Sequence, residues 1–163
     1  MIIVSDTSAI NNLASINQLN LLNQLYGNVI IPTAVYKELT ETTFPVAGAT
    51  EVQTYSWISI RSVSNQVMVE ILQKELDRGE AEAIALAVEI SADQLLIDER
   101  QGRAAAERLN LRCTGVLGVL IAAKGRKLIP EVKPLLDQLI HQAGFWVAKP
   151  LYNKVLKIAG EYN

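Results

Sequence analysis

The sequence predicts an α/β fold with a mostly parallel sheet that is covered by helices on both faces. Short, almost wholly apolar runs such as 2–5 and 94–98 are typical of strands buried on both sides. Segments with helical spacing of apolar residues separate these runs, and that alternation favours parallel strand pairing. With 163 residues, half of them apolar, the chain can bury a substantial core and is expected to be one domain over residues 1–163.

The N-terminal part alternates strands and helices. Residues 2–5 are the first predicted strand, and short helices are expected over 8–16 and 17–27. A second buried strand at 29–32 leads into a helix at 33–41, which begins directly after a proline, as helices often do. This stretch therefore supplies the first two strands of the sheet.

The middle of the chain begins with a loop rich in Thr, Pro and Gly, before a further helix. Residues 57–63 alternate in polarity and predict an exposed or edge strand. Helices are expected at 66–77 and at 80–90, the second rich in alanine, and a third buried strand at 94–98.

The C-terminal part is mostly helical. A helix over 99–111 and a short strand at 111–115 are followed by helices over 116–128, 131–144 and 150–160. The apolar runs here are too short to cross a membrane.

The net charge of −2 gives no general attraction to nucleic acid, so any such attraction needs a local patch. Residues 100–133 hold eight basic and two acidic side chains, and we expect Arg100 and Arg103 to contact substrate. Most of the other basic residues there are expected to be solvated. One cysteine and no signal-peptide pattern at the start suit a reducing compartment, and we expect a cytoplasmic location.

Acidic residues recur at predicted strand ends. Asp6 ends the first strand, and Asp98 and Glu99 end the strand at 94–98; Glu38 follows the second strand by about two helical turns, and Glu80 opens the alanine-rich helix. Parallel strands bring their carboxyl ends to one edge, where ligands of such sheets bind. Converging carboxylates repel one another unless a cation or a proton neutralises them.

The residue types favour a hard cation. Histidine and cysteine occur once each, at His141 and Cys113, which excludes a zinc site rich in imidazole or thiolate. An all-oxygen site favours Mg²⁺ or Mn²⁺. The hydroxyls of Thr7 and Ser8 can orient the Asp6 carboxylate or a metal-bound water.

Four blocks in this order resemble the PIN-domain family. VSDTSAI is similar to its opening motif, PTAVYKEL to its second block, RGEAEAIALA to its third and LLIDERQGRAAAERLNL to its fourth. The resemblance extends over residues 1–120, and the third block is most similar to a prokaryotic subgroup. It implies a three-layer α/β/α domain that cleaves RNA with a divalent metal. Many small prokaryotic members are toxins paired with an antitoxin protein, and many are homodimers.

The resemblance also implies roles for individual residues. The catalytic acids are expected to be Asp6, Glu38, Glu80 and Asp98. The metal ligands are expected to be Asp6, Glu80 and Asp98 with assistance from Glu99, supported by Thr7, Ser8 and Glu82. The third acid of the family is commonly Asp, whereas this chain offers Glu80 and Glu82. Glu80 shares its helix stripe with apolar residues and Glu82 with Glu89, so we expect Glu80 in the site and Glu82 on the solvent face or in a supporting position.

Two other interpretations stay open. Each acid taken alone could be a helix cap or a solvated charge. The chain could also be a PIN-like module that binds nucleic acid or protein with little or no catalysis. Phosphoryl transfer through an aspartyl phosphate is disfavoured, because Ser8 stands where such enzymes need a second Asp.

Overall fold

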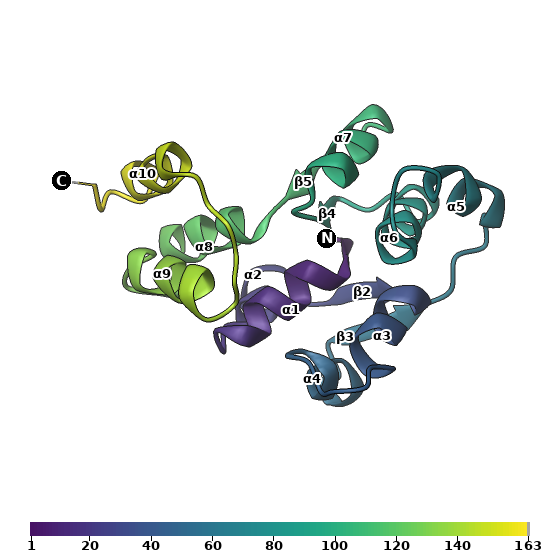
Figure 1. Cartoon of the computed structure of the whole chain (residues 1–163), viewed down its shortest axis with the longest axis horizontal. Helices are drawn as coiled ribbons and strands as arrows, with labels where there is room; N and C mark the ends of the chain where they lie inside the picture. Colours follow the sequence, from purple (N-terminus) through teal and green to yellow (C-terminus); the bar gives the residue numbers. More distant parts are fainter. Residues whose placement is uncertain (163) are drawn as a thin grey trace.

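The computed structural model describes residues 1–162, and its centre is a five-stranded sheet in which every neighbouring pair of strands is parallel (Figure 1). The strand order is β3-β2-β1-β4-β5. The strands are β1 (Ile3–Ser5), β2 (Val29–Pro32), β3 (Ile58–Arg61), β4 (Gln94–Leu96) and β5 (Cys113–Thr114). The predicted α/β class is confirmed, the sheet is parallel throughout, and β3 lies at an edge as its alternating pattern indicated.

Helices connect all of these strands. They are α1 (Thr7–Ser15), α2 (Asn20–Tyr26), α3 (Thr33–Thr40), α4 (Ala49–Thr54), α5 (Gln66–Leu72), α6 (Arg78–Glu89), α7 (Arg100–Arg108), α8 (Val116–Gly125), α9 (Lys133–His141) and α10 (Lys149–Ile158). Helix α5 ends earlier than the helical pattern predicted, at Leu72. Helix α6 begins two residues earlier than predicted, because the Asp77 side chain accepts a hydrogen bond from the Glu80 amide and caps the first turn.

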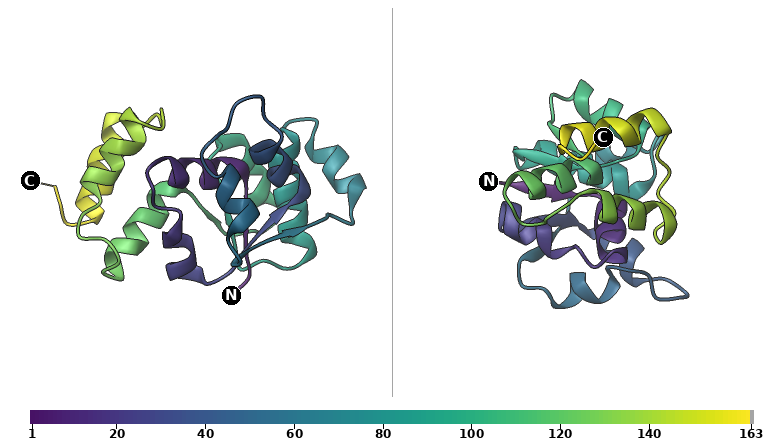
Figure 2. Two further views of the ribbon diagram at one scale, coloured as in Figure 1. Left: turned by 90° about the horizontal axis from the view of Figure 1, so that it is seen from below. Right: turned by 90° about the vertical axis from the view of Figure 1, so that its left-hand side faces the viewer.

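Side chains of successive strand residues enter two separate cores. Ile3, Ile31 and Leu96 pack with α1, α2, α3 and α8–α10 on one face. Val4 and Leu95 pack with α5, α6 and α7 on the other. This alternation explains the continuous apolar runs of β1, β2 and β4, since these strands are buried on both sides. Figures 1 and 2 show α8, α9 and α10 together at one end of the molecule, near α1 and α2.

The sheet changes direction next to β1. The chain passes from β1 to β2 and β3 on one side, and then returns to place β4 and β5 on the other side. Ser5 pairs with Leu96, and the Asp6 amide donates to the Leu96 carbonyl at 3.0 Å. The ends of β1 and β4 are therefore adjacent at the point where ligands of open parallel sheets bind. Among residues 1–162, no helix has the length and hydrophobicity needed to cross a membrane.

Candidate metal centre

Asp6 lies at the carboxyl end of β1 and caps α1. One carboxylate oxygen accepts from the Ala9 amide and the other from the Ser8 hydroxyl, both at 3.0 Å. The residue is only 2% exposed. Burial raises the pKa of the Asp6 carboxyl to about 7, and the charge of Asp98 adds to the rise, although the Ala9 and Ser8 hydrogen bonds oppose it. Ser8 thus orients this carboxylate, as expected.

A cavity of about 380 Å³ opens beside Asp6, and five acidic residues contribute to its wall. We call it the acid cavity; it is lined by Asp6, Thr7, Ser8, Asn11, Glu38, Leu39, Val46, Asp77, Glu80 and Glu99. The predicted residues Asp6, Thr7, Ser8, Glu38, Glu80 and Glu99 therefore lie together. Sequence reasoning missed Asp77, although an Asp directly before the start of a helix was a capping signal available in the sequence.

Glu80 has an unsatisfied oxygen in this cavity. Its Oε2 atom is buried and has no hydrogen-bond partner within residues 1–162. The pKa of the Glu80 carboxyl is raised to about 8, and burial is the largest cause. A hydrogen bond with Asp77 and the charges of Asp77, Glu99 and Asp6 also raise it. An ionised carboxylate with a buried free oxygen is unfavourable unless a proton or a cation joins it.

Helix starts compensate part of this negative charge. Asp6 caps α1, Asp77 caps α6, and both oxygens of Asp98 accept from the Val116 amide at the start of α8, at 3.1 and 3.2 Å. The positive ends of three helix dipoles thus face the cluster. Capping accounts for these three acids, but it gives Glu80 Oε2 no partner.

Two glycines let neighbouring helices approach these carboxylates. A Cβ atom on Gly102 of α7 would lie 2.8 Å from Glu80 Oε2 and 2.6 Å from Ile97 Cδ1. A Cβ atom on Gly115 would collide with Asp98 Oδ1. A larger residue at either position would displace an acid or its helix.

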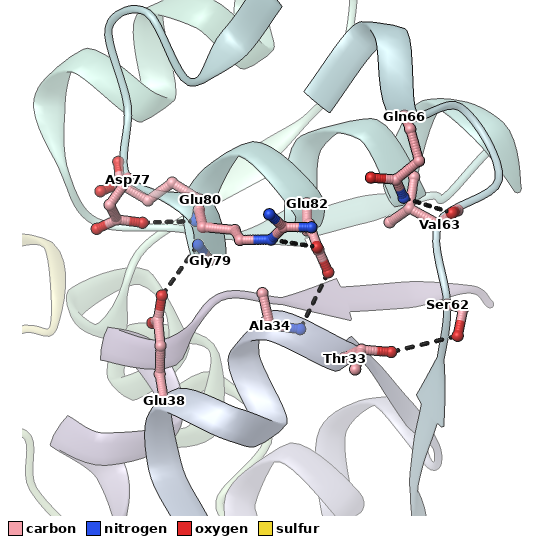
Figure 3. Close-up of polar contacts among 11 residues, drawn as sticks. Thr33, Ala34, Glu38, Ser62, Val63, Gln66, Asp77, Gly79, Glu80 and Glu82 are labelled. Atoms are coloured by element: carbon pink, nitrogen blue, oxygen red, sulfur yellow. Dashed lines mark hydrogen bonds and ion pairs between the residues drawn. The ribbon is translucent and has the colours of Figure 1, made fainter. Parts of the chain in front are cut away.

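Glu38 and Glu82 form a reciprocal pair of caps between α3 and α6, and Figure 3 draws both contacts as dashed lines. Glu38 on α3 accepts from the Gly79 amide of α6 at 3.0 Å and from the Thr7 hydroxyl. Glu82 on α6 accepts from the Ala34 amide of α3 and from Arg78 Nε, both at 3.0 Å. Thr7 therefore contacts Glu38 rather than Asp6.

Of the two positions expected for Glu82, the solvent face is wrong, and a supporting role stays a prediction. Glu82 is 4% exposed and is buried against α3, outside the acid cavity. Because α6 has alanine on almost every face, its sequence pattern does not fix which side is buried. Glu80 lies in the cavity as predicted, and its metal-binding role stays a prediction.

Asp98 and Glu99 point to different spaces. Glu99 lines the acid cavity, whereas Asp98 lines a neighbouring groove together with Arg100 and Arg103. Burial raises the pKa of the Asp98 carboxyl, and the Val116 amide and Arg103 oppose that rise. Arg103 donates to the Ile97 carbonyl at 3.3 Å, and Arg100 is exposed at the start of α7.

The donor set fits a hard divalent cation. The cavity offers carboxylate and hydroxyl oxygens, and a buried oxygen of Glu80 lacks a partner. As the side chains lie, no three acidic, His or Cys side chains within residues 1–162 are grouped closely enough to hold one ion. The chemistry of the site therefore fits Mg²⁺ or Mn²⁺. The carboxylates lie near one another, but their present positions do not let three of them bind the same ion.

A family profile described as a PIN domain (DUF3368) matches residues 2–161. The chain belongs to the PIN-domain family. PIN domains are typically nucleases that use divalent metal ions. The chain is also similar in fold to a PilT N-terminus domain protein from the hyperthermophilic archaeon Sulfolobus solfataricus P2, with 19% identity and a TM-score of 0.55 over 76% of this chain and 93% of that one. No curated protein gives a significant match.

Proposed function

We propose that this PIN domain is an endoribonuclease that depends on Mg²⁺ or Mn²⁺. The observation that carries the proposal is the buried, unpartnered Oε2 of Glu80 beside the desolvated carboxyl of Asp6. Both carboxyls have a raised pKa, so each is ready to exchange a proton for a cation near neutral pH. Asp6, Glu80 and Glu99, which line the acid cavity, are the proposed ligands, together with Asp98, whose charge acts on Asp6 from the neighbouring groove.

The chain's own residues would prepare the site for catalysis. The bound ion would orient the phosphodiester, activate water and stabilise the leaving oxygen. The Ala9 amide and the Ser8 hydroxyl hold both oxygens of Asp6 in place. Glu38 ties Thr7 to the start of α6, and that contact fixes the turn that carries Glu80. Arg100 and Arg103, next to Asp98, would contact the substrate backbone.

Cleavage of a mixed RNA pool tests the proposal. The purified chain should cleave RNA with Mn²⁺ and not with a chelator. Asp6→Asn keeps the size of the side chain and an oxygen that can cap α1, but it removes the charge. It should lower cleavage by more than about 100-fold, because loss of a residue that merely supports a metal ligand already costs about 10–100-fold.

Two outcomes would count against the proposal. Equal cleavage by the wild type and Asp6→Asn would show that the activity does not come from this site. Absence of cleavage by a folded wild type with Mn²⁺ would favour a second candidate, a PIN-like binding module with little or no catalysis. That candidate is supported by the bonds that already hold Asp6, Asp77 and Asp98 to helix starts.

We further propose that the chain is the toxin of a toxin–antitoxin pair, acts in the cytoplasm and forms a homodimer. This proposal rests on the resemblance of the four sequence blocks to small prokaryotic PIN domains. A short open reading frame directly upstream that encodes a small DNA-binding protein would support it. Growth arrest on expression, relieved by that neighbour and absent with Asp6→Asn, would test the pairing, and light scattering would give the oligomeric state.

A further inference from the structure

A groove of about 950 Å³ begins at Asp98 and extends away from the acid cavity. One wall is formed by α7, β5 and α8, and the other by Phe145, Trp146 and α10. Figure 1 shows α7 beside the sheet, and α10 close to α8 at the C-terminal end. Since Asp98 follows β4 next to the end of β1, a molecule in the groove reaches the edge of the sheet that holds Asp6.

The side chain of Trp146, which lines this groove, is exposed to solvent. The residue is 83% exposed, although tryptophan is among the side chains that gain most from burial. It lies between α9 and α10, two residues after Gly144, which has a φ of 70°. Half-buried Phe145 and exposed Leu151 line the groove as well, so its lining here is aromatic and apolar.

Basic side chains accompany this apolar surface. Arg100 and Arg103 lie at the Asp98 end, and Lys154 of α10 lies on the opposite wall. Within the described part of the chain, neither Arg100 nor Lys154 forms an ion pair. The lining holds two acids, and Asp98 is already offset by Arg103, so Glu107 is left to balance both Arg100 and Lys154.

This balance favours a nucleic-acid strand over another protein. An apolar protein surface that covered the groove would bury cations without partners, which is costly. A single strand supplies a phosphate for each cation and a flat base for the aromatic ring, the combination by which proteins hold single strands.

We propose that this groove binds single-stranded nucleic acid, with one base stacked on Trp146 and the backbone held by Arg100, Arg103 and Lys154. The inference rests on the proposed function, because it deals with how substrate reaches that site. The strand would run from Trp146 past Lys154 to the arginines, so that a phosphodiester arrives at Asp98.

Binding without chemistry tests the groove separately from catalysis. The full chain carrying Asp6→Asn is titrated, in a chelator, into a short fluorescein-labelled oligouridylate and into a duplex of the same length. Trp146→Phe keeps an aromatic face, whereas Trp146→Leu keeps apolar area without one. Trp146→Leu should weaken single-strand binding by about tenfold, as loss of one base–aromatic stack does, and Trp146→Phe should retain most of the affinity.

The salt dependence of binding gives a second, independent test of the groove. Arg100→Ala and Lys154→Ala should each flatten the dependence of log affinity on log salt by about 0.7, the value for one phosphate contact on a single strand. Lys74→Ala is the matched control, since Lys74 is exposed near the end of α5, outside the groove lining. It should leave affinity and slope unchanged.

The outcomes separate the groove from the proposed function. Unchanged binding by Trp146→Leu, unchanged salt slopes, or tighter binding of duplex would overturn the inference. A wild-type dimer that Trp146→Leu converts to a monomer would also overturn it and assign the groove to a second copy. Intact binding with no Mn²⁺-dependent cleavage would leave the groove standing and refute the nuclease.

Discussion

Two regions at the start of α6 contain buried carboxylate oxygens, and the two regions differ in whether those oxygens have hydrogen-bond donors. In the α3–α6 seam, formed by Ala34, Glu38, Arg78, Gly79 and Glu82, each oxygen of Glu82 has a hydrogen-bond donor. In the acid cavity, two residues earlier on the same helix, Glu80 Oε2 has none. The difference separates a buried acid whose oxygens are satisfied by the fold from one that leaves an oxygen free for a proton or a cation.

The largest effect should come from exchanging each glutamate for glutamine. Glu80→Gln should lower Mn²⁺-dependent cleavage by more than about 100-fold, because it removes a proposed metal ligand. Its melting temperature without metal should stay the same or rise at pH 9, where Glu80 is ionised, since a poorly solvated charge is gone. Circular dichroism melts and the RNA assay measure both properties.

Glu82→Gln should do the reverse. It weakens charge-assisted bonds to Ala34 and Arg78, each worth about 1.5–3 kcal/mol at most. A loss of about 1–2 kcal/mol corresponds to a fall of roughly 2–8 °C in a chain of this size. Cleavage by the folded protein should change little. Lost cleavage in Glu82→Gln with normal cleavage in Glu80→Gln would put the site on the wrong side of α6.

An intermediate effect should come from metal. A cation that binds only the folded state stabilises it by mass action, by about 2.7 kcal/mol at 100 times its dissociation constant. The melting temperature should therefore rise by roughly 5–10 °C with saturating Mn²⁺. The double variant Asp6→Asn, Asp98→Asn should show almost no rise.

A matched control variant tests whether the Mn²⁺ effect is specific to this site. Glu41→Gln with Glu70→Gln removes two exposed acids outside the acid cavity and should respond to Mn²⁺ as the wild type does. The same rise in all three proteins would mean that the ion acts non-specifically and would contradict a site at Asp6 and Asp98.

A further effect should be the pH dependence of stability without metal. The pKa values of Asp6 and Glu80 are raised to about 7 and about 8 in the folded chain, far above those of an unfolded chain. Between pH 5 and 7 the folded state therefore holds protons that the unfolded state has lost. Stability should fall as pH rises through 7 and 8, and then level off.

Denaturant melts at fixed ionic strength check this direction. Glu80→Gln should flatten the decline, and Glu82→Gln should not. With Mn²⁺ present the decline should shrink, because the ion replaces the protons. A metal-free wild type that gains stability between pH 6 and 9 would contradict the raised pKa values.

The sequence predicted the sheet well for a local reason. A strand buried on both faces must be apolar throughout, so the pattern identified β1, β2 and β4, and alternating polarity identified the edge strand β3. The parallel order also placed Asp6 and Asp98 at neighbouring strand ends. The end of α5 at Leu72 and the start of α6 after Asp77 were predicted less well, since capping of α6 by Asp77 depends on a single side chain rather than on periodicity.

The sequence pattern did not determine which face of α6 is buried. Alanine fits against α3, the sheet or α7 with little difference in energy, so only packing decided that Glu82 lies against Ala34. The exposure of Trp146 had the same origin, because nothing in its local sequence distinguishes a core tryptophan from one at a groove rim.

By itself the sequence determined the order of the elements, the parallel α/β class, the family resemblance and the acids Asp6 and Glu80 as site candidates. These features depend on local periodicity and on the residue types at strand ends, both of which can be read from the sequence. Only the tertiary structure brought Asp77 into the acid cavity, separated Glu99 from Asp98, and set Gly102 against Glu80. Those contacts join residues distant in sequence, and their geometry depends on how helices pack across the sheet.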